Sequence, residues 1–453
     1  MGKHKIPENG IYDARTLGAG RMLLLGFQHM FAMFGATILV PILTGLDVSN
    51  TLLFAGLGTL LFHLITGGKV PAFLGSSFAF LGGYAAVAPM IDDTLPNTEL
   101  LPYACFGVAC AGLVYAVLAA LVRAFGAEKV MRFFPPIVTG PIIIAIGLNL
   151  SASAINNCSG SWWIAIAAIG IIVAANIWGR GMVKIIPILL GVVGSYALAV
   201  IFDAGVRETL VKNVSEAALL ALPVKMDQTV FGLFARGNVD RDMLLTAVIT
   251  IVPLSLATMV EHIGDVSAIS STCGRNYIQD PGLHRTLLGD GLATTLAALF
   301  GAPANTTYGE NTGVLALSRI YDPRVIRIAA ILAMCFSFSP KFAAIISSMP
   351  GGTIGGVSLV LYGMISAVGV RNVVENQVDF TKSRNVLIAA LILVLSIGIS
   401  YSKAGALTFG SVSLSGLAVG SLVGIVLNAV MPGKDYVFGQ NPQGDESVNF
   451  IIQ

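Results

Sequence analysis

The sequence is poor in charged residues, which occupy only 11% of its 453 positions, whereas a soluble domain would carry roughly 25%. The 26 basic and 24 acidic residues nearly balance, so there is no basic field that would recruit nucleic acid. Hydrophobic residues make up 55% of the chain, and long apolar runs recur from residue 22 to residue 431. This composition predicts a polytopic membrane protein.

Several signatures of other protein classes are missing as well. The five cysteines are odd in number and have no CxxC spacing, so we expect them to pack rather than to bind metal or form disulfides. No Walker or dinucleotide glycine motif occurs, which excludes an activity driven by nucleotide hydrolysis. Helical metal motifs and a nucleophile–base pair are also lacking, so we predict no enzyme activity, cofactor or metal site. The polar first 21 residues do not read as a signal peptide, so the first span should be its own anchor.

What is present is a series of about fourteen candidate membrane spans, two of them interrupted by glycine and polar residues. They cover residues 22–43, 52–66, 70–87, 103–122, 137–152, 162–178, 185–202, 243–260, 287–300, 305–320, 325–349, 354–370, 385–400 and 412–431. Lysine and arginine gather in every second connection, whereas the short connections between these have none. Both terminal segments, 1–21 and 432–453, should therefore be cytoplasmic, and 204–242 should form a long extracytoplasmic loop.

The spans divide into two sets of seven, and an odd number forces the two sets to run in opposite directions through the membrane. Internal similarity supports this division: PAFLGSSFAF (71–80) in the third segment resembles PANTTYGEN (303–311) in the tenth. Likewise, FPPIVTGPIII (134–144) in the fifth resembles MPGGTIGGVSL (349–359) in the twelfth. Interrupted segments at corresponding positions point to a transporter's substrate site, because irregular backbone at membrane depth needs protein or a cavity around it.

Acidic residues stand where charge is costly. Glu261 and Asp265, near the end of the eighth span, share one helix face through their i, i+4 spacing, and Glu310 lies in the broken tenth segment. A charge at the bilayer centre costs roughly 2.5–3.5 kcal/mol. The alternative is that the eighth span ends early in cytoplasmic water and that Glu310 lies on a solvated outer turn. If they are buried, Glu261 and Asp265 should share one proton near neutral pH, which would be a basis for proton coupling.

Other polar residues in the spans have plainer interpretations. His29 and His63 are expected to be buried core histidines rather than proton carriers. His262 should point away from the helix face that carries Glu261. Asp290 lies five residues after Arg285, a cytoplasmic marker, so we expect it to be solvated or paired near that surface.

Six blocks in order along the chain resemble the nucleobase–ascorbate transporter family, and within it the bacterial uracil permeases. The blocks are FQHMFAMFGATILVP (27–41), PAFLGSSFAF (71–80), EHIGD (261–265), DPGLHRTL (280–287), NTTYGENTGV (305–314) and GGVSLVLYG (355–363). The resemblance implies a proton-coupled symporter that carries uracil across the inner membrane and works as a homodimer in lipid.

The same resemblance implies an architecture. Two inverted repeats of seven spans would build a core domain from residues 22–122 and 243–349, and a gate domain from residues 130–203 and 354–431. Spans 1–4 and 8–11 belong to the core, and spans 5–7 and 12–14 to the gate. Short antiparallel strands in segments 3 and 10 would meet at the substrate site.

Site residues follow position by position from the family's motifs. Glu261 and Glu310 match two carboxylates that hold the uracil ring, and Phe78 and Gly309 match positions whose backbone N–H groups reach its carbonyl oxygens. This agrees with simple chemistry, because uracil offers two N–H donors and two C=O acceptors around a flat apolar ring. Carboxylates can take the donors, and amides at half-helix N-termini can take the acceptors.

Aromatic positions around the site are matched by Tyr308 and Tyr362. Asp265 is a departure, because the uracil-permease pattern has histidine there, and an acid at that position occurs in purine-transporting relatives. Those relatives, however, usually carry glutamine in place of Glu310. A xanthine or urate carrier is therefore the nearest alternative, and an anion transporter of the same architecture is a more distant one, since its site should carry a positive group.

Overall fold

A computed structural model describes residues 10–91, 95–237, 239–403, 405–409 and 412–434 of the chain. Helices dominate the first half: α1 (Ala19–Thr44), α2 (Val48–Ile65), α3 (Leu81–Val87), α4 (Leu101–Phe125), α5 (Ala127–Met131), α6 (Pro136–Ser159), α7 (Trp162–Trp178), α8 (Met182–Ile185), α9 (Pro187–Phe202) and α10 (Ala204–Glu216). The second half continues with α11 (Val230–Ala235), α12 (Arg241–Ile251), α13 (Ser255–Cys273), α14 (Leu283–Leu299), α15 (Gly309–Ser318), α16 (Pro323–Ser337), α17 (Pro340–Ser347), α18 (Gly351–Glu375), α19 (Ser383–Ser400) and α20 (Gly416–Val430). Four short strands complete the fold: β1 (Leu74–Ser76), β2 (Asn305–Thr307), β3 (Ala406–Phe409) and β4 (Val412–Ser415).

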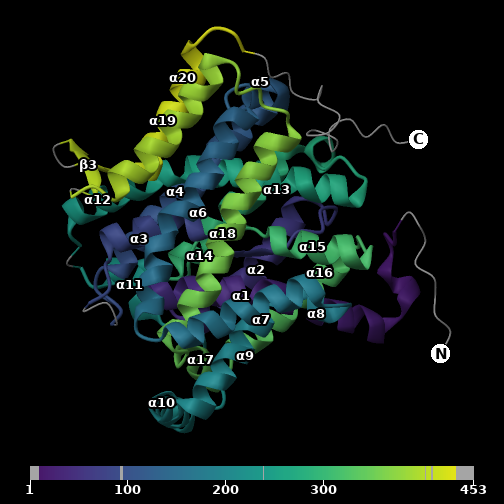
Figure 1. The fold of residues 1–453 in the computed structure, drawn as a ribbon, viewed down its shortest axis with the longest axis vertical. Helices are drawn as coiled ribbons and strands as arrows, with labels where there is room; N and C mark the ends of the chain where they lie inside the picture. The colour runs from purple at the N-terminus through teal and green to yellow at the C-terminus, as the bar shows by residue number, and fades with distance from the viewer. Residues whose placement is uncertain (1–9, 92–94, 238, 404, 410–411, 435–453) are drawn as a thin grey trace.

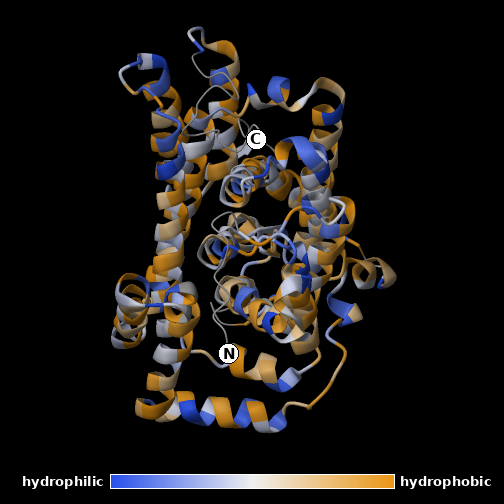
Figure 2. Ribbon diagram, turned by 90° about the vertical axis from the view of Figure 1, so that its right-hand side faces the viewer, coloured by the Kyte–Doolittle hydropathy of each residue, from blue (hydrophilic) through white to orange (hydrophobic). Residues whose placement is uncertain are grey.

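Apolar helices long enough to cross a membrane are the main building units. Among the described residues there are 7 such helices, or 9 if the two sharply bent pairs, α9–α10 (107°) and α16–α17 (88°), each form one span. Figure 2 shows hydrophobic residues along most of the length of the long helices. The prediction of a mostly helical, multi-pass membrane protein is therefore confirmed.

The long helices pack in two groups (Figure 1). In the first group α2 packs against α14 and α16, α4 packs against α12 and α14, and α1 packs against α16. In the second group α6 packs against α18, α19 and α20, and α7 packs against α9 and α18. Helices α1 and α13 contact members of both groups, so they lie along the boundary between them.

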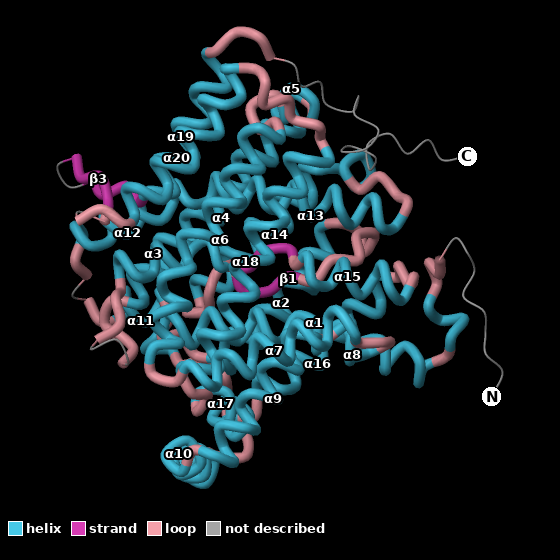
Figure 3. The backbone as a smooth tube through the Cα atoms, in the orientation of Figure 1, coloured by secondary structure: helices cyan, strands magenta, loops and turns pink. Residues whose placement is uncertain are grey.

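Near the centre of the bundle, β1 and β2 cross as an antiparallel pair, drawn in magenta in Figure 3. Gly75 lies opposite Thr306 in the register. Helical threonines hold both strands: Thr59 Oγ1 receives a bond from the N–H of Leu74 (2.9 Å), and Thr294 Oγ1 donates to the carbonyl of Asn305 (2.7 Å). Short strands at this place were the expectation from the family resemblance, and the structure contains them.

Local sequence accounts for several helix ends. Helix α1 stops at Gly45, whose φ of 80° is a left-handed conformation that glycine adopts without strain. Two residues later Asp47 caps α2 by accepting from the N–H of Asn50 at 3.0 Å. Pro253 interrupts the hydrogen-bond ladder between α12 and α13, and a single 3-10 turn joins these helices there. Helical structure nevertheless runs on to Cys273, well beyond the predicted end of the eighth span at residue 260.

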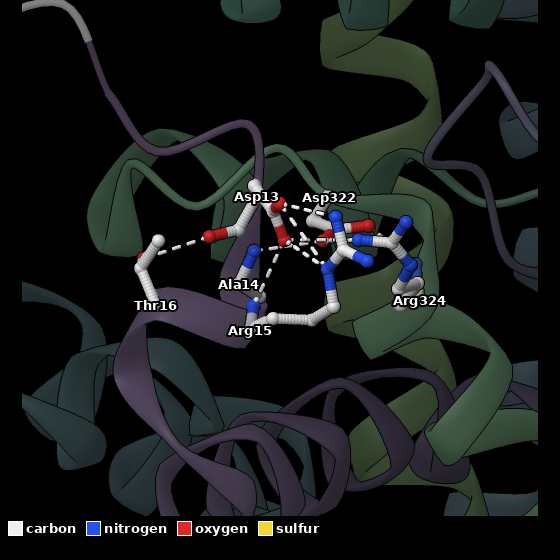
Figure 4. A network of polar contacts seen from close by, with 6 residues as sticks. All are labelled: Asp13, Ala14, Arg15, Thr16, Asp322 and Arg324. Carbon is white, nitrogen blue, oxygen red and sulfur yellow. Dashed lines mark hydrogen bonds and ion pairs between the residues drawn. The ribbon is translucent and has the colours of Figure 1, made fainter.

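The segment before α1 is fastened to the α15–α16 connection by backbone pairing and by a polar network (Figure 4). The N–H of Ile11 donates to the carbonyl of Arg319, and the N–H of Ala14 donates to Asp322 Oδ2 at 2.7 Å. Arg324 Nη1 lies 2.9 Å from Asp13 Oδ1. The side chain of Arg15 also hydrogen-bonds Asp13 and, with Arg324, holds the pKa of that carboxyl well below its usual range.

Two features of the fold were not predicted from the sequence. The fourteenth segment opens with strand β4, which pairs with β3 in a hairpin before α20 begins. The eleventh segment is bent by 88° between α16 and α17, at Pro340. The predicted cytoplasmic ends fall partly outside the described residues, which comprise 10–21 of the first end and 432–434 of the second.

Candidate functional site

Two helix N-termini open at the crossing of β1 and β2. Phe78 begins a helical turn directly after β1, and Gly309 begins α15 directly after β2. The preceding residues, Ser77 and Tyr308, have extended backbone and make no side-chain capping bond. Their own N–H groups are used in the crossing, since Ser77 donates to Ala304 O and Tyr308 donates to Phe73 O. The N–H groups of the first turns therefore remain available to an acceptor, at the positive ends of both helix dipoles.

The three acidic residues singled out in the sequence are brought together beside these helix ends. Glu261 and Asp265 lie on α13, Glu310 lies in the first turn of α15, and α13 packs directly against α15. Their charges are close enough to interact with one another. A side chain built on Gly309 would come within 3.5 Å of Asp265 Oδ1, which places this carboxylate at the start of α15.

The position of Glu261 along its helix decides between the two interpretations of these acids. It precedes Cys273, the end of α13, by twelve residues, which corresponds to about 18 Å of helix. The helix therefore does not end early in cytoplasmic water. Glu261, Asp265 and Glu310 are half-buried at the depth of the strand crossing, and neighbours such as Val260 and Ile263 are fully buried.

Glu261 has an unmet hydrogen-bonding demand. Its Oε2 atom is buried and has no hydrogen-bond partner within the described part of the chain. Over the same residues, neither Glu261, Asp265 nor Glu310 forms an ion pair with lysine or arginine. A buried acceptor left unpaired costs about 1–3 kcal/mol, more when charged, so these carboxylates are suited to meet donors that the protein itself does not supply.

Open space lies next to the carboxylates. Gly264 and Gly309 are solvent-exposed although they lie in the middle of the bundle. A side chain added at Gly264, between the two acids of α13, or at Gly313, one turn after Gly309, would meet no other atom within 4 Å. The exposed faces of α13 and α15 thus border a space that a small molecule could enter.

The three aromatic residues predicted for the site, Phe78, Tyr308 and Tyr362, belong to one buried cluster. Phe78 and Tyr362 on α18 meet edge to face, with ring centroids 5.7 Å apart and an angle of 77° between the rings. Both side chains are buried. Because α18 belongs to the second packing group, this contact joins the two groups at the site.

Tyr308 is buried against the strand crossing. Its hydroxyl donates to the carbonyl of Ser76 at 2.9 Å and lies 3.3 Å from Thr37 Oγ1. A side chain on Gly75 would be only 2.5 Å from the Tyr308 ring, so β1 needs glycine where this ring packs against it. Tyr308 therefore stabilises the strand crossing through its contacts with β1.

A buried acid–base pair that sequence reasoning did not find lies directly behind the site. His262 Nδ1 on α13 is 2.6 Å from Asp290 Oδ2 on α14, and both side chains have 0% exposure. The expectation that Asp290 is solvated near Arg285 is wrong, because helix α14 carries it inside the bundle; the alternative expectation of a partner is correct. His262 points away from the face of Glu261, as predicted. The remaining core histidines, His29 and His63, are both buried as well.

Comparison with known proteins identifies relatives over nearly the full chain. A model described as the Permease family matches residues 20–405. The uracil permease of Bacillus caldolyticus is 40% identical over 442 residues, which cover 94% of this chain and 95% of the relative. The uracil permease of Bacillus subtilis (strain 168) is 38% identical, with 89% and 91% covered, and the putative pyrimidine permease RutG of Escherichia coli (strain K12) is 37% identical, with 91% and 89% covered.

Solved structures share the fold at much lower sequence identity. The murine Slc26a9 anion transporter in the inward-facing state aligns with a TM-score of 0.59 at 12% identity, covering 94% of this chain and 69% of that one. The transmembrane domain of the cyanobacterial bicarbonate transporter BicA aligns with a TM-score of 0.55 at 13% identity, covering 93% and 99%. This chain thus shares its fold with both of these proteins. The family model and the sequence relatives show that the chain belongs to the nucleobase–ascorbate transporter family of permeases and is a transporter, not an enzyme.

Proposed function

We propose that this protein takes up uracil together with a proton across the inner membrane. The observation that carries the proposal is the unpaired Oε2 of Glu261, which lies in a group of carboxylates beside two open helix N-termini. Uracil complements this arrangement, because its N–H groups can donate to Glu261 and Glu310 while its carbonyl oxygens accept from the amides of Phe78 and Gly309. The uracil permeases among the relatives support the same substrate.

The aromatic residues would hold the ring. Phe78 and Tyr362 provide an apolar edge-to-face pair where the two packing groups meet. A flat base placed against them would bury its apolar surface while its polar edge faces the carboxylates. In this proposal Tyr308 positions Gly309 and Glu310 through its bond to Ser76 and does not cover the ring itself.

Proton coupling is proposed from the charges at the site. Three carboxylates lie close together, and within the described residues none has a cationic partner. Taking more than one such charge through the membrane would be costly, so protonation of the Glu261–Asp265 pair would accompany movement. One proton moving inward draws on about 2.3 kcal/mol per 100 mV, which is enough for about 50-fold accumulation of uracil.

The proposed movement needs two bodies, and the helix packing supports them. The first packing group corresponds to a core domain (22–122 and 243–349) and the second to a gate domain (130–203 and 354–431). Among the described residues, α1, α13 and some shorter elements bridge the two groups, and α13 carries Glu261 and Asp265. A shift of the core against the gate would expose the site alternately to the two sides of the membrane.

Packing symmetry supports two inverted repeats of seven spans. Exchanging each segment with its counterpart seven spans away turns one observed contact into another: α4 with α14 becomes α16 with α2, α7 with α18 becomes α19 with α6, and α1 with α9 becomes α13 with α20. The strands obey the same exchange, because the bond from Ser77 N–H to Ala304 O corresponds to that from Tyr308 N–H to Phe73 O. With an odd number of spans in each repeat, both termini would be cytoplasmic.

The decisive experiment is uptake of radiolabelled uracil into proteoliposomes with an imposed inward proton gradient, challenged with unlabelled uracil, xanthine and urate. We expect uphill uptake that unlabelled uracil blocks and the purines do not. Blocking by xanthine would instead make Asp265 the indicator of substrate class, and uptake that ignores the gradient would refute the proton mechanism. Crosslinking of the protein in the same liposomes tests the expected homodimer.

Anion transport, which is the function of the structural neighbours Slc26a9 and BicA, is not supported at this site. The helix N-termini alone would suit an anion. Here, however, Glu310 lies in the first turn of α15, α13 brings Glu261 and Asp265 against that helix, and no lysine or arginine among the described residues pairs with these acids. Bicarbonate that leaves uracil uptake unchanged in the same liposomes would agree with this assignment.

A further inference from the structure

We propose that His262 and Asp290 act as a positioning pair that sets the distance between the two walls of the substrate site. The pair joins three elements, since Asp290 comes from α14, His262 from α13, and Thr307 Oγ1 at the end of β2 lies 3.0 Å from the same His262 nitrogen. It contacts no substrate in this arrangement. Its effect would pass through the residues next to it in the chain.

Sequence neighbours show what the pair controls. His262 directly follows Glu261, the acid with the unpaired oxygen, so rotation of α13 about its axis would move both side chains together. Thr307 precedes Glu310 by three residues and ends the strand from which α15 starts. The contacts of His262 Nδ1 with Thr307 Oγ1 and Asp290 Oδ2 thus link the wall that carries Glu261 to the wall that carries Glu310.

The chemistry of the His262–Asp290 contact shows which atom carries the proton. An ionised carboxylate can only accept hydrogen bonds, so a proton in the 2.6 Å contact lies on His262 Nδ1, which Thr307 Oγ1 also approaches at 3.0 Å. The other ring nitrogen, Nε2, is buried without a hydrogen-bond partner in the described part of the chain. The ring is therefore held through Nδ1 alone, and its position depends on Asp290 and Thr307 together.

Packing seals the pair away from water. The Phe62 ring lies edge-on to His262, with centroids 6.4 Å apart. A side chain at Gly289 would come within 2.9 Å of Phe62, so the glycine before Asp290 lets this ring close over the pair. A buried ion pair is a poor way to gain stability, because apolar residues of similar size often serve as well. Its value here is geometric.

Variants of His262 test the proposal through uracil binding to the purified, full-length protein. Asparagine places an amide near the position of Nδ1 and can still donate to Asp290, whereas glutamine places its amide one bond further out and leucine has no donor. We expect His262→Leu and His262→Gln to weaken uracil binding by about tenfold or more, and His262→Asn to stay close to wild type. Thr286→Val, a buried polar position one turn earlier on α14, is the matched control.

A double-variant cycle tests whether the two residues act as one unit. Asp290→Leu should weaken binding about as much as His262→Leu, and the double variant should be no weaker than the worse single one. Effects that multiply would overturn the pairing. If the leucine variants do not fold, the comparison of His262→Asn with His262→Gln decides the question, because only the position of the amide differs.

Thermal unfolding of the same samples separates positioning from a general loss of structure. Folded His262→Gln protein that binds uracil within about twofold of wild type would overturn the proposal, even if it unfolds at a lower temperature. This inference rests on the proposed function in one respect, because uracil is the ligand whose binding is measured. If wild-type protein does not bind uracil, the proposed function fails; if wild type binds and all pair variants bind equally, only the positioning role fails.

Discussion

Replacing Glu261 by glutamine should move uracil affinity and protein stability in opposite directions. The side chain keeps its size, but one acceptor oxygen becomes an NH2 donor. In the proposed complex this oxygen receives an N–H of uracil, so the variant loses a charge-assisted hydrogen bond and sets two donors against each other. Such bonds contribute about 1.5–3 kcal/mol, which predicts uracil binding weaker by about 10- to 150-fold.

In the absence of substrate, the Glu261→Gln change should increase the stability of the folded protein. Oε2 of Glu261 is buried and unpaired, and the charges of Asp290 and Glu310 lie close enough to repel it. Glutamine removes that repulsion, so the substrate-free variant should unfold at a higher temperature than wild type. An acid that mattered only for folding would show the opposite: its loss would lower stability and leave affinity unchanged.

The assay is titration calorimetry with uracil, combined with thermal unfolding in the same detergent. Glu128→Gln serves as the control, because it makes the same chemical change at an exposed position on α5. Wild-type affinity in the Glu261→Gln variant would refute the placement of the uracil donor. Continued uphill uptake driven by pH in that variant would refute its role in proton coupling.

Further predictions concern the strand crossing, the aromatic pair and the segment before α1. Gly75→Ala should lower the yield of folded protein and abolish uptake, because its Cβ would lie 2.5 Å from the Tyr308 ring, whereas Gly82→Ala meets no atom and should be silent in the same expression and uptake assays. Tyr362→Phe should keep uracil affinity and Tyr362→Ala should weaken it, by about 0.5–1.5 kcal/mol for the lost ring pair alone; equal affinities would contradict the assignment. Asp13→Asn should lower the unfolding temperature at pH 7, and the difference from wild type should shrink progressively as the pH falls below about 4. Neighbouring arginines keep the pKa of Asp13 below its ordinary value, so its stabilising effect is present above about pH 4 and is lost as the pH falls further; an effect independent of pH or of added salt would count against this.

Features that depend on local chemistry could be predicted from the sequence. Pro71 and Pro303 each precede a short polar or glycine-rich stretch inside an apolar segment, and helices break there because the ladder of N–H donors is interrupted. Glu310 stands out in the sequence because a carboxylate between two apolar runs is costly to bury, which indicates a functional role. Both broken segments prove to be strand-to-helix junctions at the centre of the molecule.

Features that depend on the relative rotation of helices could not be predicted. Nothing in the spacing of EHIGD and LLGDG says that His262 and Asp290 face each other, because this depends on how α13 is turned against α14. The closeness of Asp290 to Arg285 in the sequence predicts a position near the surface. Five residues of helix, roughly 7.5 Å, are nevertheless enough to carry it from the surface into the core. The docking of Ile11 beside Ile320 is equally a contact between segments far apart in sequence.

This permease shares its fold with anion transporters, and its site residues indicate why it would favour a different ligand. Two half-helix N-termini meeting at the membrane centre favour negative charge or carbonyl oxygens in any protein built this way. In this chain Glu310 lies in the first turn of the helix that Gly309 begins, and α13, which carries Glu261 and Asp265, packs against that helix. The field of the acids repels an anion, while the amides still attract carbonyl groups, so the favoured ligand is neutral and presents acceptors along with donors. Because these acids form no ion pair with lysine or arginine among the described residues, the proposed uptake would balance their charge with protons. In that proposal the same three side chains would both select the nucleobase and couple its movement to protons.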